Sequence, residues 1–263
     1  MPGVVDAAMA APEVGLDRAK PGAPDGSPIQ PDVVSSMPVI AVGGECRADT
    51  DCSSGHCADG VCCNESCDTP CRSCDLSTSR GVCQDNINSA DGDSCPGTTQ
   101  TCVIGGQCGQ VDQQQNGPRN ANGGLEPGIV WAQTVTVGRA GKLVGVRIGL
   151  RCGDIVVSVQ IRSVDNGIPT DTVLATAYGD GKKNLAQRPD GQLPLIIFPQ
   201  PITVQVGQKL AFVLSVVSGP NSCYVDFSGS YPGGTAVLID SRVSPQWTVN
   251  SSQDLLFQTF VVP

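Results

Sequence analysis

Histidine, glutamate and aromatic residues are scarce in this chain of 263 residues. It has one histidine, His56, and four glutamates, Glu13, Glu45, Glu65 and Glu126, and aromatic side chains make up 4% of it. Because neither histidine nor glutamate follows Glu126, the second half cannot contain a Ser-His-Asp or Cys-His constellation. The sequence therefore predicts a protein that is not an enzyme. The remaining alternative, a glycosidase, would need a cleft with two aspartates within roughly 10 Å of each other.

Basic charge and long apolar runs are also lacking. The chain has 16 Lys and Arg against 25 Asp and Glu, a net charge of -9, which argues against binding nucleic acid or an anionic membrane. No run approaches the roughly 18 apolar residues that a transmembrane segment needs. The first residues, MPGVVDAAMAAPEVG, contain no export signal. We expect a leader to have been removed or to lie upstream of this start.

Cysteine, in contrast, is abundant, and twelve of the fourteen cysteines lie in one short stretch. An even number at this density, with few large apolar residues nearby, predicts a disulfide framework formed in an oxidising compartment. The pairing is not predictable from spacing, although the adjacent Cys62 and Cys63 must point to different partners. The twelve are Cys46, Cys52, Cys57, Cys62, Cys63, Cys67, Cys71, Cys74, Cys83, Cys95, Cys102 and Cys108.

Metal binding is the alternative for this stretch. A structural zinc site needs two ligand pairs, whereas the stretch has a single CxxC, Cys71 to Cys74, and one histidine, so a disulfide framework is favoured. Calcium is the better metal candidate, because the run QDNINSADGDS is rich in oxygen ligands. Its candidate ligands are Asp85, Asn88, Asp91 and Asp93. An ordinary Asx-rich turn is the favoured alternative, and no other cofactor is expected.

Composition divides the chain into four parts. Residues 1–44 form a Pro- and Asp-rich stalk, 45–108 the disulfide-rich module, 109–127 a polar linker, and 128–263 a β-sandwich. Within the stalk, the run from Met37 to Gly44 is either an extended linker, which its composition favours, or an edge strand that pairs with its own domain or a neighbour.

The last part alternates apolar and polar residues in short runs between turn residues, which predicts strands. Ten such runs predict an antiparallel β-sandwich of jelly-roll type, so the fold class is mainly β. The runs cover residues 129–137, 142–150, 154–163, 172–177, 193–198, 202–206, 208–217, 222–227, 235–240 and 255–262. Cys152 and Cys223 are expected to pair across the sandwich, with two separate buried thiols as the alternative.

A ligand surface on the sandwich would combine exposed rings with polar loops. The runs SYPGG and SPQW place Tyr231 and Trp247 in two late loops, so these are the candidate ligand-binding rings. Packing of both rings over the end of the sandwich is the favoured alternative.

The motif SGHCADGVCCNESCDTPCRSC after a Pro- and Asp-rich stalk resembles Cys-rich modules of exported and lipid-anchored surface proteins of myxobacteria, over residues 1–108. The runs WAQTVTVGRAGKLVGVRIGL and WTVNSSQDLLFQTFVV resemble the jelly-roll choice-of-anchor domains of bacterial secreted proteins, over residues 129–263. These resemblances imply an extracellular or cell-surface bacterial protein of lipoprotein-like type, used for display or adhesion. The expected partner is a surface carbohydrate or protein. The alternative is a structural subunit of an extracellular filament or coat that self-associates through its N-terminal extension.

Overall fold

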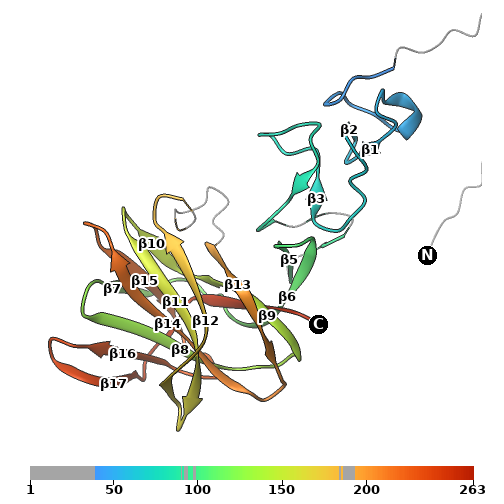
Figure 1. Cartoon of the computed structure of the whole chain (residues 1–263). Helices are drawn as coiled ribbons and strands as arrows, with labels where there is room; N and C mark the ends of the chain where they lie inside the picture. The colour runs from blue at the N-terminus through green and yellow to red at the C-terminus, as the bar shows by residue number, and fades with distance from the viewer. Residues whose placement is uncertain (1–38, 90, 92–93, 97–98, 184, 186–192) are drawn as a thin grey trace, which may run out of the picture. The chain divides into compact units, whose positions relative to one another are not determined.

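The computed structural model describes residues 39–263, apart from 90, 92–93, 97–98, 184 and 186–192 (Figure 1). Residues 1–38, most of the predicted stalk, lie outside the described residues. The described chain is built of short antiparallel strands, with a disulfide-rich module first and a β-sandwich after it. The predicted fold class is therefore confirmed. Among the described residues, no helix is both long and apolar enough to cross a bilayer.

The disulfide-rich module has little regular structure, so disulfides supply its core. Its elements are the 3-10 turn η1 (Asp49–Asp51) and the strands β1 (Cys57–Ala58), β2 (Val61–Cys62), β3 (Arg72–Ser73) and β4 (Gln84–Asp85). Most of its cysteine side chains are buried and pack together, where a larger domain would have aliphatic residues. The bonds are Cys46–Cys57, Cys52–Cys62, Cys63–Cys74, Cys67–Cys83, Cys71–Cys102 and Cys95–Cys108.

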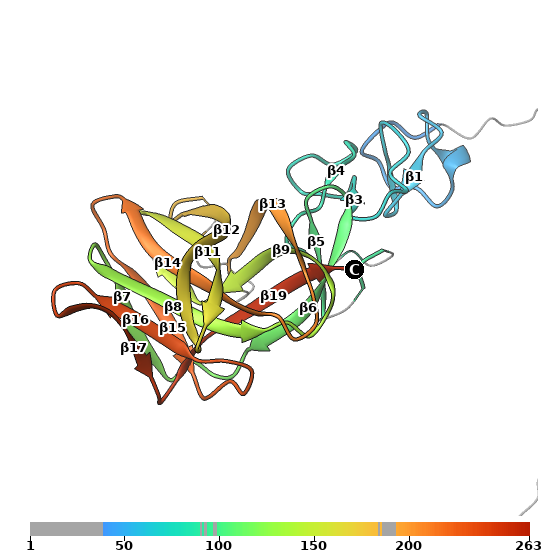
Figure 2. The same ribbon diagram turned by 60° about the horizontal axis from the view of Figure 1, so that its bottom comes forward.

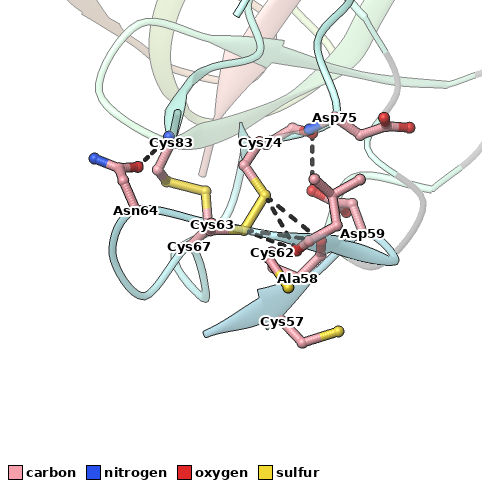
Figure 3. Close-up of a disulfide and its surroundings, with 12 residues drawn as sticks. Cys57, Ala58, Asp59, Cys62, Cys63, Asn64, Cys67, Cys74, Asp75 and Cys83 are labelled. Atoms are coloured by element: carbon pink, nitrogen blue, oxygen red, sulfur yellow. Dashed lines mark hydrogen bonds between the residues drawn. A yellow bond between two sulfur atoms is a disulfide. The ribbon is translucent and has the colours of Figure 1, made fainter. Parts of the chain in front are cut away.

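Adjacent cysteines connect successive parts of this module. Cys62 bonds to Cys52 in the first part. Cys63 bonds to Cys74 in the second part, as Figure 3 shows. The backbone N–H of Cys83 donates to Oδ1 of Asn64 at 2.8 Å, which fixes the chain just after the pair. The prediction that the two neighbours take different partners is confirmed.

The module begins earlier than the sequence indicates, at Ile40 rather than at residue 45. The backbone N–H of Ile40 donates to the carbonyl of Asp51 at 2.7 Å, and that of Cys62 donates to Gly44 at 2.8 Å. The Ile40 side chain packs on the cluster formed by the Cys46, Cys52 and Cys62 side chains. The described part of the run 37–44 therefore pairs with its own module and is not an extended linker.

The sandwich has two layers. One is a six-stranded sheet in the order β12-β11-β14-β8-β16-β17. Its strands are β8 (Ile129–Thr136), β11 (Val156–Asp165), β12 (Ile168–Asp180), β14 (Lys209–Ser218), β16 (Ala236–Asp240) and β17 (Ser244–Asn250). The chain changes layer at most connections from β8 to β16, which is the jelly-roll-like feature of the fold.

The second layer combines two smaller sheets. A five-stranded sheet has the order β13-β9-β19-β6-β5, and a second sheet joins β10, β15 and β18, with β7 beside β15; Figure 2 shows β9, β19 and β6 in the first of them. The strands are β5 (Gln100–Val103), β6 (Gln107–Gln115), β7 (Ala121–Leu125), β9 (Gly141–Ile148), β10 (Leu150–Cys152), β13 (Leu195–Val204), β15 (Cys223–Ser228), β18 (Asp254–Leu255) and β19 (Phe257–Val262).

Gly149 lies where these two smaller sheets meet. Its N–H donates to the carbonyl of Leu256 at 2.8 Å, and its carbonyl accepts from the N–H of Asp226 at 2.7 Å. A side chain at this position would begin 3.0 Å from Cβ of both Asp226 and Leu256, so glycine suits the close approach of the three strands. The backbone bonds make the two sheets one continuous layer.

Strand alternation separates the core from the outer face of the second layer. Val146, Ile148 and Leu150 are almost completely buried between the layers, with Phe212 and Phe257 among the large core side chains. The residues between them along the strand, at positions 147, 149 and 151, consequently face away from the core. Cys152 bonds to Cys223, which confirms the predicted pair, but the bond joins the adjacent strands β10 and β15 of one sheet and does not cross the sandwich.

The prediction of a polar linker at residues 109–127 is wrong, because most of this segment forms strands β6 and β7. Strand β6 pairs with β5 and β19, so backbone hydrogen bonds hold a sequence whose side chains are mainly polar. In β7, Gly123 lies against the Trp131 ring, where a Cβ atom would come within 2.8 Å of the ring. The Trp131 Nε1–H also donates to the carbonyl of Gly124 at 2.8 Å. Gly123 therefore serves packing rather than chain flexibility.

Two further strand predictions are corrected. The runs 193–198 and 202–206 contribute to a single strand, β13, whose register shifts between Ile197 and Ile202. The run SPQW, predicted as a loop, belongs to β17, which pairs with β16 at the edge of the six-stranded sheet. β17 is an edge strand and is paired on one side only, so its residues show no clear alternation of apolar and polar side chains.

Candidate functional site

The two rings proposed from the sequence as ligand contacts are held by the sandwich itself. Tyr231 is 7% exposed, its ring packs edge-on against Phe257 with centroids 5.1 Å apart, and its hydroxyl donates to Gln113. Trp247 is half-buried and packs against the apolar cluster that includes Val237. Tyr231 is therefore a core residue, which agrees with the packing alternative favoured from the sequence and corrects its candidate place on a ligand surface. Trp247 lies on an edge strand, away from a late loop.

The three described calcium candidates contact different groups of the protein. Asp85 is exposed and lies 3.8 Å from Arg72, whereas the Oδ1 atom of Asn88 accepts from Arg147 at 2.9 Å. Asp91 is 5% exposed, and its Oδ2 atom accepts from the backbone N–H of Cys71 at 2.9 Å. Asp93 lies outside the described residues. Each described candidate has a different protein partner, as expected for the Asx-rich turn.

Two groups of three cysteine sulfurs lie close enough to resemble metal sites. They are Cys46 with Cys52 and Cys62, and Cys71 with Cys95 and Cys102. Each of these sulfurs already belongs to a disulfide, and the described chain has no free cysteine. Because a metal ligand must be a thiolate, these groups are neighbouring disulfides.

A pocket on the outer face of the second layer is the strongest candidate site. Its volume is about 440 Å³, within the range of roughly 300–1,000 Å³ typical of small-molecule sites. We call it the arginine pocket. It is lined by Asn116, Gly117, Arg119, Arg147, Gly149, Leu150, Arg151, Leu193, Pro194, Asp226, Leu256 and Gln258. It therefore lies over the junction of the two smaller sheets, where Gly149 brings no side chain.

An ion pair organises one wall of the arginine pocket. Arg151 on β10 holds Asp226 on β15, with Nη2 2.9 Å and Nε 3.0 Å from Oδ1 of the carboxylate. The Asp226 side chain is 10% exposed, so this charge is largely removed from water by its partner. Arg119, from the β6–β7 connection, lies 3.8 Å from the same oxygen and is 50% exposed. It is therefore too far for a direct hydrogen bond to Asp226 and remains accessible from the pocket.

Arg147 borders the pocket but points its guanidinium group towards the disulfide-rich module. Its Nη2 atom donates to Asn88 at 2.9 Å and to Thr101 at 3.0 Å, and Nη1 donates to Gln258 at 3.3 Å. The guanidinium carbon lies 5.1 Å from the centroid of the Phe260 ring. Arg147 is 8% exposed, so it connects the module to the sandwich more than it serves the pocket.

An exposed aromatic ring adjoins the ion pair. Tyr224 pairs with Arg151 across β10 and β15, and the guanidinium carbon lies 5.6 Å from the centroid of the ring. Tyr224 is 45% exposed, because its neighbour on β7 is Gly124, which has no side chain to cover the ring. The outer face thus presents a ring, two guanidinium groups and a carboxylate side by side.

This arrangement is suited to binding. The described lining of the arginine pocket contains one carboxylate, Asp226, and that carboxylate is held by Arg151. Two-carboxylate glycoside cleavage needs a second carboxyl group on the opposite side of the substrate. The polar lining instead offers guanidinium and amide donors, with Leu256 as an apolar contact.

Sequence reasoning missed the residues of this pocket, although a partial signal was present. In the run VRIGLRC, Arg147, Gly149 and Arg151 occupy the polar phase of the strand alternation. Arg119, Asp226 and Gln258 come from distant segments, so only the strand pairing brings them to the same place.

Comparison with known proteins adds no family to these observations: no protein-family model matches the chain, and no curated protein matches it significantly. The two resemblances drawn from the sequence therefore stay predictions.

Proposed function

We propose that this chain is a non-catalytic binding protein of the cell exterior or cell surface, and that its β-sandwich binds carbohydrate through the arginine pocket. Seven disulfides and no free cysteine among the described residues fit a protein of an oxidising compartment. The disulfide-rich module then acts as a covalently stabilised spacer before the sandwich.

The single observation that carries the proposal is the exposed Tyr224 ring beside the Arg151–Asp226 ion pair and the pocket. A sugar has an apolar ring face and a rim of hydroxyl groups. It is therefore bound best by an aromatic or apolar surface next to fixed hydrogen-bonding groups. A cavity of about 440 Å³ also suits a saccharide better than a folded protein partner, which would need an interface of roughly 1,200 Å² or more.

A glycan array probed with the intact protein tests this proposal, with two variants as the critical pair. We expect Tyr224→Ala to abolish binding to whichever saccharides the native chain retains. Tyr178→Ala is the matched control, because Tyr178 is 61% exposed but lies on β12 in the opposite layer. If the native protein retains no saccharide, or if both variants bind as the native chain does, the proposal is wrong.

The alternative, a filament or coat subunit assembled through the N-terminal extension, has less support. It uses the run 37–44 as a strand donated to a neighbouring molecule, but the backbone of Ile40, Gly43 and Gly44 already pairs within the same chain. Sedimentation of the intact protein at high concentration, compared with a chain lacking residues 1–38, measures any assembly through the extension.

A further inference from the structure

The charges around the arginine pocket differ from those of the molecule as a whole. The chain has a net charge of -9, so its general field repels anionic ligands. Around the Asp226 carboxylate, however, the described structure places two guanidinium groups, those of Arg119 and Arg151. Arg147 is left out of this comparison because its donors are used elsewhere. The local excess of positive charge is therefore one unit at the pocket wall.

The two arginines are not equivalent. The Nε and Nη2 donors of Arg151 contact Asp226, which fixes the orientation of the arginine. The Arg151 side chain is 33% exposed. Arg119 makes one ion pair among the described residues, at 3.8 Å, and is 50% exposed. A guanidinium group presents five donors in a fixed fork that matches the geometry of a carboxylate or sulfate group. Arg119 is thus the group on this wall with donors to offer a bound anion.

The remaining lining suits the body of a sugar. Leu256 supplies an apolar contact, and the side-chain amides of Asn116 and Gln258 supply both donors and acceptors for hydroxyl groups. The exposed ring of Tyr224 adjoins the same wall through its contact with Arg151. An anion without an apolar body, such as free phosphate, would leave these surfaces unused.

We propose that the arginine pocket recognises an acidic saccharide, and that Arg119 contacts its carboxylate or sulfate group while the sugar ring lies along the wall formed with Tyr224. This inference rests on the proposed function and specifies its ligand class. Charge steers the ligand to this face and selects it over neutral sugars, because a neutral sugar leaves the Arg119 donors in water.

Isothermal titration of the intact chain with three probes of equal length tests the inference. The probes are trigalacturonate, its fully methyl-esterified form and a sulfated neutral trisaccharide. We expect the free acid to bind at least about 10-fold more tightly than the ester, since a charged carboxylate accepts stronger hydrogen bonds from a guanidinium group than a neutral ester does. Binding of the acid should weaken as salt is raised, because part of the attraction is exposed to solvent.

The critical variant is Arg119→Gln, with Arg139→Gln as the matched control. Arg139 is an exposed arginine that donates to Gln110 at 3.3 Å and is absent from the pocket lining. We expect Arg119→Gln to weaken binding of the acidic probe about 10-fold and to leave the ester unchanged, while the control changes neither. Urea denaturation of both variants verifies that they are folded.

The outcomes separate this inference from the proposed function. Binding of the sulfated probe in place of the uronate would support the inference, with sulfate as the anionic group. Equal binding of acid and ester, with no effect of Arg119→Gln, would overturn the inference and leave carbohydrate binding in place. Absence of binding to all three probes, together with an empty glycan array, would overturn both.

Discussion

Arg151 and Asp226 form the central charge pair of the outer face, with Nη2 and Oδ1 2.9 Å apart. The carboxylate is 10% exposed, and Arg151 is its closest cation. We expect Arg151→Gln to lower the free energy of unfolding by about 2–3 kcal/mol, because it leaves a mostly buried carboxylate without its closest cation.

Arg119→Gln is the control for this prediction, since its ion pair to Asp226 is long and exposed. It should change stability by less than about 0.5 kcal/mol. Urea denaturation followed by tryptophan fluorescence measures both variants. If Arg151→Gln and Arg119→Gln lower the free energy of unfolding equally, the Arg151–Asp226 pair has no special role in the fold.

The buried carboxylate of Asp254 holds three segments of the sandwich together. Its two oxygens accept from the backbone N–H groups of Tyr231 and Ala236, each at 2.7 Å, and from Nε2 of Gln133 at 2.9 Å. Asp254→Ala leaves three buried donors without a partner, so we expect a loss of about 3–5 kcal/mol in the free energy of unfolding. Asp254→Asn keeps one acceptor oxygen and should lower the free energy of unfolding by less.

An exposed aspartate supplies the comparison. The side chain of Asp171 is fully accessible, so Asp171→Ala should lie within about 0.5 kcal/mol of the native chain. If Asp254→Ala is as well tolerated as Asp171→Ala in thermal and urea denaturation, the three hydrogen bonds do not contribute as described.

Tyr231 gives the fold a dependence on alkaline pH. Burial raises the pKa of its phenol from 10.0 to about 12, and the negative charge of Asp112 acts in the same direction. Because the folded chain holds this proton more tightly than the unfolded chain does, the associated stability is complete below pH 10.0 and is lost as pH rises to about 12. Unfolding measured across this interval should show the loss.

Tyr231→Phe tests this assignment, and Tyr178→Phe is its exposed counterpart. In a titration of phenolate absorbance, Tyr231→Phe should remove the component near pH 12, whereas the control should retain it. A native-like titration of Tyr231→Phe would mean that this phenol is not the late-ionising group.

Arg147 connects the disulfide-rich module to the sandwich through Asn88, at 2.9 Å, and it also donates to Thr101 of β5 at 3.0 Å. We expect Arg147→Met to keep the apolar stem but to free this contact, so amide hydrogen exchange in residues 86–89 and 100–103 should accelerate about 10-fold or more. Arg139→Gln, on an exposed arginine, should leave exchange there unchanged. Unaltered exchange in Arg147→Met would show that the β5–β6 pairing alone fixes the module.

Sequence reasoning succeeded where one side-chain property dominates. Burial of one strand face directly produces the alternation of Val146, Ile148 and Leu150 with outward-facing residues, so the strand could be predicted from the sequence. The different partners of Cys62 and Cys63 follow from the geometry of neighbouring residues. These features need no knowledge of distant parts of the chain.

The failures arose where backbone pairing or distant contacts decide the structure. Strand β6 is polar because its backbone, rather than an apolar face, joins it to β5 and β19. Tyr231 lies in a loop-like run yet enters the core, whereas Tyr224 shares a run with Cys223 and Val225 and faces outward. The alternation in SCYVDF contains that second signal, but the run SYPGG made Tyr231, rather than Tyr224, a candidate ligand-binding ring, with packing as the favoured alternative.

Oxidised sulfur is the central claim, and intact-mass spectrometry of protein exported through an oxidising compartment tests it most directly. Seven disulfides predict no reaction of the unfolded, unreduced chain with a maleimide. After reduction, the mass should rise by about 14 Da, two hydrogens for each bond, and all cysteines should react. Extensive maleimide labelling of the unfolded chain before reduction would contradict the account, provided that the sandwich was folded in the protein before it was unfolded.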